Sequence, residues 1–327
     1  MNISYINTVR ALAIITVVGI HVAGPALYQP MNANWWTGNI IASLSRIRVP
    51  LFLMISGALL LHKDEPVRIF FKKRFSKILI PFLFWSAFYY IYQIRSGLDM
   101  NSFIKVLLGN GIMYHLWYFY LIIPLYLLIP LLRKIVKHIP VQYILVYALI
   151  ASSIVTLSGL LGLFETSLTI YTNPFSGGVA YLLLGYAITH KDMKVHFLSL
   201  YAIISVLAII LGTYWLSIYT GGLNVLLYEG FGLPVMIYAI AVFTFIKNKQ
   251  KDVTSNSRFV SLLSTYSFGI YLLHPYLLIK VQEIVMDFPL LTKIGLIDQF
   301  VTLTATMVTC SLTVFIISKI KWLNRII

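Results

Sequence analysis

The first hydrophobic stretch, residues 7–27, carries two groups capable of chemistry in an otherwise apolar run. Arg10 lies near its start and His21 lies deep inside, with no other ionisable side chain between them. Eleven positions on an α-helix make three turns plus about 20° and a rise of roughly 16 Å, so both side chains share one face. Ionisable groups inside a membrane helix are costly and usually functional. The alternative is an interfacial arginine that anchors the helix end and a histidine bonded to a neighbouring carbonyl.

Two further arginines, Arg46 and Arg48, interrupt the next apolar segment, residues 37–61, roughly 14 Å from its outer end. Because positions i and i+2 point to different faces of a helix, the two need not share one site. Two arginines at this depth are expensive unless they face a wet cavity or an anionic partner. The alternative is that each pairs with backbone carbonyls at a kink before Pro50.

A basic cluster follows this segment and is spread over two helical turns beside the membrane. Its members are Lys72, Lys73, Arg74 and Lys77. Bare charge at this place can set topology or hold anionic lipid. It can also clamp the phosphates of a cytoplasmic ligand that bears a nucleotide.

Another histidine, His115, lies near the outer end of the apolar segment 112–132, two residues before Trp117. A belt of interfacial aromatic residues explains Trp117 without any function. It does not explain His115, because a polar imidazole gains nothing from contact with lipid. We therefore predict that His115 contacts a substrate. We also assign Trp117 to substrate binding, although a place in the belt alone would account for it.

The segment 259–279 contributes a third histidine, His274, about 21 Å along the helix from its cytoplasmic end. Tyr271 lies three residues earlier and so on the same face. A histidine directly before a proline, here Pro275, can be purely structural. The alternative is that His274 and Tyr271 belong to a functional site in the outer half of the membrane.

These depths place His21, His115 and His274 in the outer half of the membrane, so we expect them to converge on one site with the two buried arginines. Three histidines can bind zinc, but these lack close spacing and carboxylates beside them, so we expect no metal. Embedded carboxylates are almost absent, which argues against a cation or proton pathway. Cys310 and Ser56 have no base partner in the sequence, and we assign both to packing.

The elements that must hold these residues are membrane helices. Hydrophobic residues make up 59% of the 327 positions and charged residues only 11%, which is the composition of an integral membrane protein. We predict an all-α, polytopic fold with about ten transmembrane helices in a single domain, residues 1–327. The predicted spans are 7–27, 37–61, 78–94, 112–132, 141–161, 175–190, 196–217, 230–246, 259–279 and 295–318.

The loop charges predict the orientation. Nineteen lysines and arginines fall on the side of the N-terminus and four on the other, with Arg46 and Arg48 inside a helix. This bias places both termini in the cytoplasm. Membrane topology thus explains the net charge of +15. We therefore expect no nucleic-acid partner. Membrane lipid is the expected environment.

Five sequence blocks resemble the acyltransferase 3 family of integral membrane acyltransferases. They are Arg10 with His21 in the first helix, then SRIRVPLFLMISG, KKRFSKILIPF, YHLWYFY and SFGIYLLHP. They occur in the family's order between residues 5 and 280. YHLWYFY further resembles the subgroup that contains the enterobacterial common antigen O-acetyltransferase.

The resemblance implies a multi-pass protein of the bacterial cell membrane that takes an acyl group from cytoplasmic acyl-CoA, usually acetyl-CoA. The group passes to a hydroxyl of an envelope glycan, an exported glycan or a lipid-linked sugar. His21 matches the catalytic histidine of the family and Arg10 its partner arginine. Arg74 and Lys77 match the basic pair, although a lysine replaces the commoner arginine at Lys77 and cannot make a bidentate phosphate contact.

In this interpretation the CoA phosphates rest on a set of cations at the cytoplasmic side, namely Arg10, Lys73, Arg74 and Lys77. His21 takes the proton from the acceptor hydroxyl or accepts the acyl group covalently, and both routes stay open. Arg46 or Arg48 could stabilise the oxyanion of the tetrahedral intermediate. His115, Tyr271 and His274 would orient the acceptor sugar or His21. The rival classes are a transporter or exporter of a small acyl or sugar-like solute and a membrane scaffold without chemistry. A scaffold would leave the cost of the buried arginines unexplained.

Overall fold

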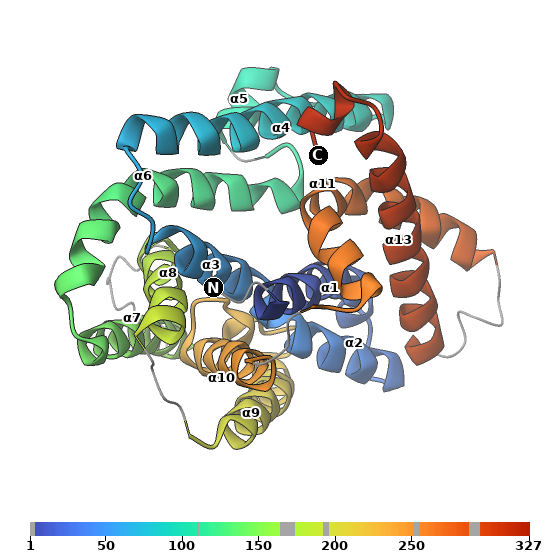
Figure 1. Ribbon diagram of the computed structural model, residues 1–327. Helices are drawn as coiled ribbons and strands as arrows, with labels where there is room; N and C mark the ends of the chain where they lie inside the picture. The colour runs from blue at the N-terminus through green and yellow to red at the C-terminus, as the bar shows by residue number, and fades with distance from the viewer. Residues whose placement is uncertain (1–3, 110, 164–173, 192–195, 252–254, 288–294) are drawn as a thin grey trace.

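The computed structural model describes residues 4–109, 111–163, 174–191, 196–251, 255–287 and 295–327 (Figure 1). Its α-helices are α1 (Ser4–Leu27), α2 (Ala33–Leu44), α3 (Arg48–Leu60), α4 (Val67–Arg95), α5 (Phe103–Leu108), α6 (Trp117–His138), α7 (Val141–Gly162), α8 (Pro174–His190), α9 (Leu198–Thr220), α10 (Leu233–Lys249), α11 (Arg258–Met286) and α13 (Gly295–Ser318). Short 3-10 turns lie at Ser45–Ile47, Tyr114–Leu116, Leu226–Tyr228 and Leu323–Arg325. No strand occurs in the described ranges, which confirms the predicted all-α class.

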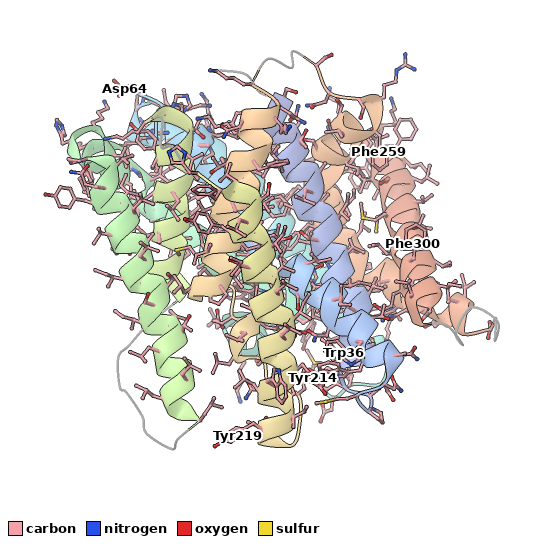
Figure 2. All side chains as sticks on the ribbon, turned by 90° about the horizontal axis from the view of Figure 1, so that it is seen from below. Trp36, Asp64, Tyr214, Tyr219, Phe259 and Phe300 are labelled. Carbon is pink, nitrogen blue, oxygen red and sulfur yellow. The ribbon has the colours of Figure 1, made fainter. Side chains whose placement is uncertain are left out.

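Within the part of the chain that the structure describes, nine helical segments are long and apolar enough to cross a membrane. The protein is therefore a multi-pass membrane protein. The predicted span 175–190 corresponds to α8, which is shorter, at 17 residues. Figure 2 shows Asp64 and Phe259 at one end of the helices and Trp36 and Tyr219 at the other. The loop charges predict the same division of these four residues between the two sides of the membrane.

The helix α1 forms the centre of the bundle, with α2, α3, α10, α11 and α13 around it (Figure 1). Of its most apolar 18-residue window, 67% is buried, against 22% in α7, α9 and α13. A helix that is apolar on all sides and enclosed by others belongs to the core, whereas the peripheral helices present apolar faces to lipid. The residues of α1 are thus shielded from lipid, including those that could do chemistry.

The predicted span 37–61 is one crossing made of two helices. A 3-10 turn at Ser45–Ile47 separates α2 from α3. Pro50 lies in the first turn of α3, where its missing N–H would have no intrahelical partner in any case. The change of helix type turns the side chains on its two sides in different directions.

The helices α3 and α8 cross in close contact because each has a glycine at the crossing. A Cβ atom on Gly57 would lie 1.8 Å from the Leu182 oxygen, and one on Gly185 would lie 2.0 Å from the Met54 oxygen. Both obstacles are backbone atoms, which cannot rotate away. Small residues at such crossings let membrane helices approach closely.

We expect Gly57→Ala to lower the free energy of unfolding by at least about 2 kcal/mol, because the added methyl group must push α8 away from α3. The measurement is thermal or denaturant unfolding of the purified protein in detergent. Gly162→Ala is the matched control, since a Cβ there meets no atom of another described element within 4 Å. Equal stability of the two variants would contradict the crossing described here.

Candidate active site

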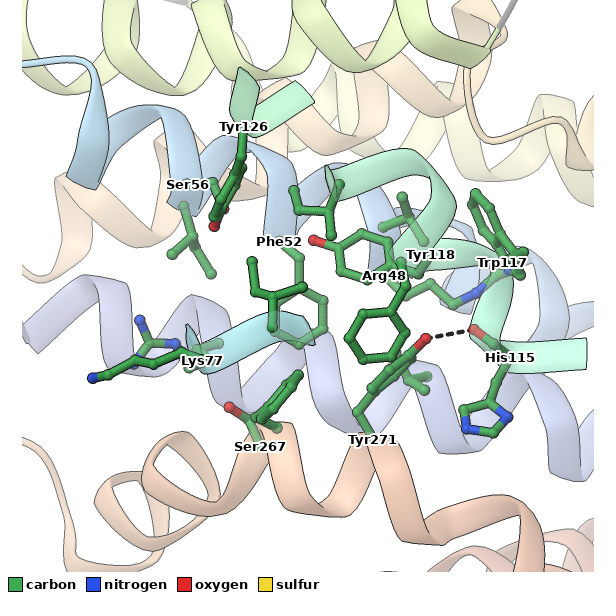
Figure 3. Close-up of a pocket in the computed structure, with 18 of the residues that line it drawn as sticks. Arg48, Phe52, Ser56, Lys77, His115, Trp117, Tyr118, Tyr126, Ser267 and Tyr271 are labelled. Carbon is green, nitrogen blue, oxygen red and sulfur yellow. Dashed lines mark hydrogen bonds between the residues drawn. The ribbon is translucent and has the colours of Figure 1, made fainter. Parts of the chain in front are cut away.

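A cavity of about 410 Å³ lies between α1, α3, α4, α6 and α11 (Figure 3). Cationic side chains line one end, where Figure 3 shows Lys77, and Arg48 and His115 line the other. Aromatic and aliphatic side chains line the space between the ends, with Phe52 near the middle. The cavity therefore joins a charged mouth to a polar chamber through an apolar passage.

The cationic end collects three of the four cations predicted to bind phosphates, namely Arg10, Arg74 and Lys77. Arg74 and Lys77 lie three residues apart on α4 and so share a face. The Arg10 guanidinium donates to the Ser264 hydroxyl at 3.4 Å. The fourth cation, Lys73, is not part of the cavity lining, and its side chain is 60% exposed.

Arg10 and His21 both line the cavity, as their spacing predicts, but they lie near its opposite ends. Eleven helical residues separate them by roughly 16 Å. Arg10 is therefore placed to hold an anionic part of a ligand and not to contact the imidazole. Direct pairing of the two side chains does not occur.

The three histidines converge at the other end. The ring of His21 stacks on that of His274 at 5.2 Å between centroids, and His274 lies 5.4 Å from His115 in an edge contact. His21 and His115 line the cavity, whereas His274 is fully buried behind His21. Tyr114 also packs on His21, at 4.6 Å. Tyr114 was not among the predicted site residues, although it directly precedes His115.

Hydrogen bonds settle the tautomer of one of these rings. The Nδ1 atom of His274 lies 2.7 Å from the Tyr271 carbonyl, which can only accept, so Nδ1 carries the proton. Among the residues that the structure describes, the Nε2 atom of His274 has no hydrogen-bond partner, and neither ring nitrogen of His115 has one. Buried polar atoms are usually paired, so the nitrogens of His115 at the cavity are candidates to bind a ligand hydroxyl.

Tyr271 and Trp117 both line the cavity. The Tyr271 hydroxyl, however, donates to the His115 carbonyl (Figure 3). This bond ties α11 to the turn Tyr114–Leu116 and fixes the backbone that carries His115. The proton of the Tyr271 hydroxyl is thus engaged, so toward a substrate this hydroxyl can act only as an acceptor. Trp117 contributes to a binding chamber in addition to any place in an interfacial belt.

The structure places Arg46 and Arg48 in different surroundings. Arg48 lines the cavity at the end that holds His21. The Arg46 guanidinium instead lies over the Tyr228 ring at 3.7 Å and donates to the Tyr228 carbonyl at 3.3 Å. Arg46 is absent from the cavity lining. It pairs with a backbone carbonyl, as the alternative expects, but that carbonyl belongs to Tyr228 and not to the kink before Pro50, and the Tyr228 ring adds a cation–π contact.

The two remaining candidate nucleophiles are Ser56 and Cys310. Ser56 lines the cavity, and its hydroxyl lies 3.3 Å from that of Tyr126, with no base beside it. Cys310 is a free thiol in the packed core. Across the residues with described positions, no three His, Cys, Asp or Glu side chains are arranged to hold a metal ion.

Comparison with known proteins gives two matches. A family model described as an acyltransferase domain matches residues 3–316. The chain is also similar to a serine/alanine racemase of Enterococcus gallinarum, with 35% identity over 126 residues, which are 35% of this chain and 17% of the racemase. The chain thus spans less than a fifth of that curated relative. No solved structure matches the chain.

Proposed function

The chain belongs to the acyltransferase 3 family, and from this premise we propose that it is an acetyl-CoA-dependent O-acetyltransferase of the bacterial cell membrane. Its acceptor is a hydroxyl of a cell-envelope or exported glycan, or of a lipid-linked sugar. One observation carries this proposal: a single cavity joins three cations at one end to His21 and Arg48 at the other. Both chain ends lie in the cytoplasm in this arrangement, which puts the cationic mouth where acyl-CoA is available.

The shape of the donor fits this cavity. CoA is polyanionic at its nucleotide end and has a long, thin arm that ends in the thioester. Arg10, Arg74 and Lys77 hold the phosphates at the mouth. The arm then runs through the apolar passage and brings the acyl group to His21.

The chemistry needs one base and one oxyanion partner. The acceptor oxygen attacks the thioester carbonyl carbon while a ring nitrogen of His21 takes its proton. Arg48 stabilises the negative charge that develops on the carbonyl oxygen. The carbon–sulfur bond then breaks, and the CoA thiolate takes the proton back from the imidazolium and leaves as the thiol. His115 binds the acceptor hydroxyl through its unpaired nitrogens, beside Trp117.

A covalent variant of this route has His21 attack the thioester first and pass the acyl group to the acceptor in a second step. The two routes differ in a single-turnover reaction with labelled acetyl-CoA and no acceptor. A labelled protein that loses its label on addition of acceptor supports the covalent route. Absence of label supports direct transfer.

The proposed function is tested by incubating the purified protein with labelled acetyl-CoA and envelope glycan. We expect label on the glycan and release of CoA. The companion measurement compares the ester content of envelope glycans in cells with and without this protein. Unchanged ester content together with uptake of a small solute into vesicles would favour the transporter class instead.

The cationic mouth makes a separate prediction. We expect Arg74→Gln to raise the KM for acetyl-CoA by roughly 10- to 100-fold with little change in kcat, because a charge-assisted contact to phosphate is lost. The KM for acetyl-pantetheine, which lacks the nucleotide phosphates, should not change. Steady-state kinetics with both donors provides the measurement.

Arg68→Gln is the matched control for this variant, since Arg68 is an exposed cation on the same helix and is not part of the cavity lining. We expect both donors to behave with it as with the original protein. If Arg74→Gln impaired both donors equally, the phosphates would not lie at this mouth.

A further inference from the structure

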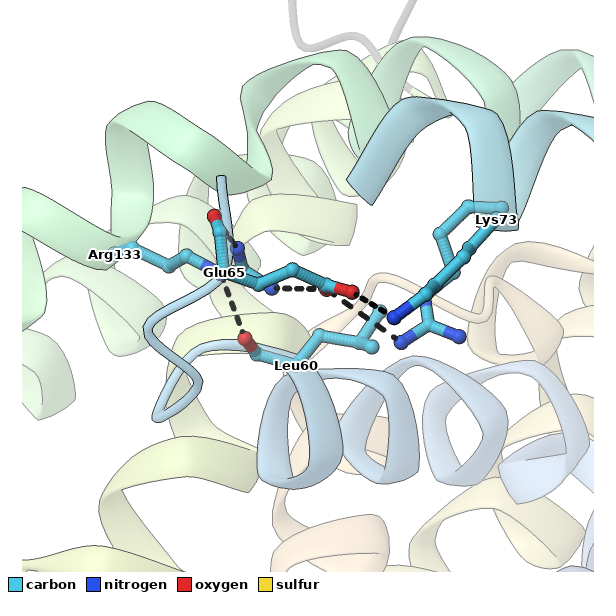
Figure 4. A network of polar contacts seen from close by, with 5 residues as sticks. Leu60, Glu65, Lys73 and Arg133 are labelled. Atoms are coloured by element: carbon cyan, nitrogen blue, oxygen red, sulfur yellow. Dashed lines mark hydrogen bonds and ion pairs between the residues drawn. The ribbon is translucent and has the colours of Figure 1, made fainter. Parts of the chain in front are cut away.

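The loop between α3 and α4 inserts a carboxylate into the basic cluster (Figure 4). The Glu65 carboxylate lies 3.0 Å from Lys73 Nζ and 3.6 Å and 4.0 Å from Nη2 of Arg133 and Arg74. Its own side chain is 13% exposed. Glu65 thus contacts three cations at the cytoplasmic end of the bundle, although the proposed chemistry makes no use of it.

The backbone of this loop is held by Arg133, a buried residue of α6 that is 7% exposed. Its Nε donates to the Leu60 carbonyl at 2.9 Å, and its Nη1 donates to the Glu65 carbonyl at 3.2 Å. The first bond satisfies a carbonyl at the end of α3 that has no intrahelical partner. The position of Glu65 is therefore set by its backbone and does not depend on Lys73 or Arg74.

The carboxylate satisfies these cations only in part. Only the contact with Lys73 falls within hydrogen-bonding distance. Glu65 Oε2, Arg74 Nε and Arg133 Nη2 are buried atoms that find no hydrogen-bond partner in the described part of the chain. A phosphate group carries more charge and three oxygens, so it can satisfy more of these donors than a planar carboxylate can.

Arg74 belongs to both arrangements, because it also lines the cavity. An anion at the cavity mouth and the Glu65 carboxylate would therefore compete for one guanidinium. The neighbouring Lys73 ammonium lowers the pKa of Glu65, so the competing group is ionised at neutral pH. We propose that Glu65 is an internal competitor for phosphate, displaced from Arg74 by the phosphates of the donor.

This inference rests on the proposed function for the identity of the donor, and it makes Glu65 a positioning residue. Between turnovers the carboxylate offsets part of the positive charge of these cations. When the product CoA leaves, the return of Glu65 replaces the lost contacts. The cost of displacing it keeps CoA binding weak enough for release, and only ligands that carry phosphates are affected.

The test uses Glu65→Gln in the full chain, purified in neutral detergent, with calorimetric binding of CoA, inorganic pyrophosphate and pantetheine. We expect CoA and pyrophosphate to bind roughly fivefold more tightly, the scale of one partly exposed ion pair. Pantetheine binding should not change. Glu283→Gln is the matched control, because it removes the same charge from a pair with Lys280 at 2.8 Å, away from the cavity.

Unchanged or weaker binding of CoA to Glu65→Gln would overturn the inference, since Glu65 would then only support the loop. Tightening seen only with vesicles that contain phosphatidylglycerol would also overturn it and assign the cations to lipid headgroups. Should Glu65→Gln be too unstable to assay, Glu65→Asp provides the same test. Its shorter side chain withdraws the carboxylate from Arg74 while the bonds from Arg133 to the backbone remain.

The outcomes separate this inference from the proposed function. Tighter binding of CoA and pyrophosphate without any acyl transfer would uphold the role of Glu65 and reject the transferase. Acyl transfer with unaltered binding in Glu65→Gln would reject the role of Glu65 alone.

Discussion

Replacement of His21 by alanine is expected to lower the rate of acyl transfer by about 10²- to 10⁴-fold, the range that a general base contributes. The imidazole lines the end of the cavity and packs between the rings of Tyr114 and His274. A water molecule that fills the space left by the imidazole is a weaker base and has no fixed orientation, so it cannot replace His21 as the proton acceptor. The measurement is kcat for transfer from labelled acetyl-CoA to glycan.

The matched control is His62→Ala. His62 also stacks on a second histidine, His190, at 4.5 Å, but both rings bond the Ala58 carbonyl, and neither lines the cavity. We expect this variant to keep its kcat. Turnover in His21→Ala equal to that of the original protein would remove His21 from the mechanism, provided that both variants bind CoA.

The second large effect is expected for Arg48→Lys, with kcat lowered by about 10²- to 10³-fold, as for the loss of one oxyanion donor. The substitution keeps the positive charge but replaces a planar, multidentate donor by a point charge on a different stem. KM for acetyl-CoA should change little, because the stabilised charge develops only in the transition state. Steady-state kinetics in detergent separates the two constants.

Arg46→Lys controls for the loss of a buried guanidinium in the same broken helix. Arg46 contacts the ring and carbonyl of Tyr228, outside the cavity. We expect this variant to lose stability while its kcat changes far less than that of Arg48→Lys. The reverse order of effects on kcat would mean that Arg46, not Arg48, faces the reacting atoms.

The helical periodicity and the hydrophobic spans were accessible from the sequence because both are local properties. Arg10 and His21 share one helix, so the helical repeat alone predicts that their side chains face one cavity. The same counting predicts the depth of His115 and His274; the ring of His274 meets that of His21, and His115 joins the group through its contact with His274. The order of the sequence blocks likewise indicated the family that the match over residues 3–316 shows.

The choice of contact partner could not be read from these patterns. Arg46 and Arg48 lie two positions apart and so point to different faces of a helix, but the sequence does not show which of the two faces the cavity. Lys73 and Arg74 are adjacent and both contact Glu65, yet of the two it is Arg74 that lines the cavity. The helical repeat does not show which packed neighbour a given face will meet.

Contacts between distant parts of the chain decided the remaining roles. The Tyr271 hydroxyl is occupied by the carbonyl of His115, which is 156 residues away in sequence. Arg46 finds Tyr228 across 182 residues. The sequence by itself determined which side chains must be shielded from lipid, because the cost of exposing an ionisable group to lipid depends on the group and its depth. Only the tertiary structure decided what each one meets, because that depends on which helices pack together and how closely their backbones approach.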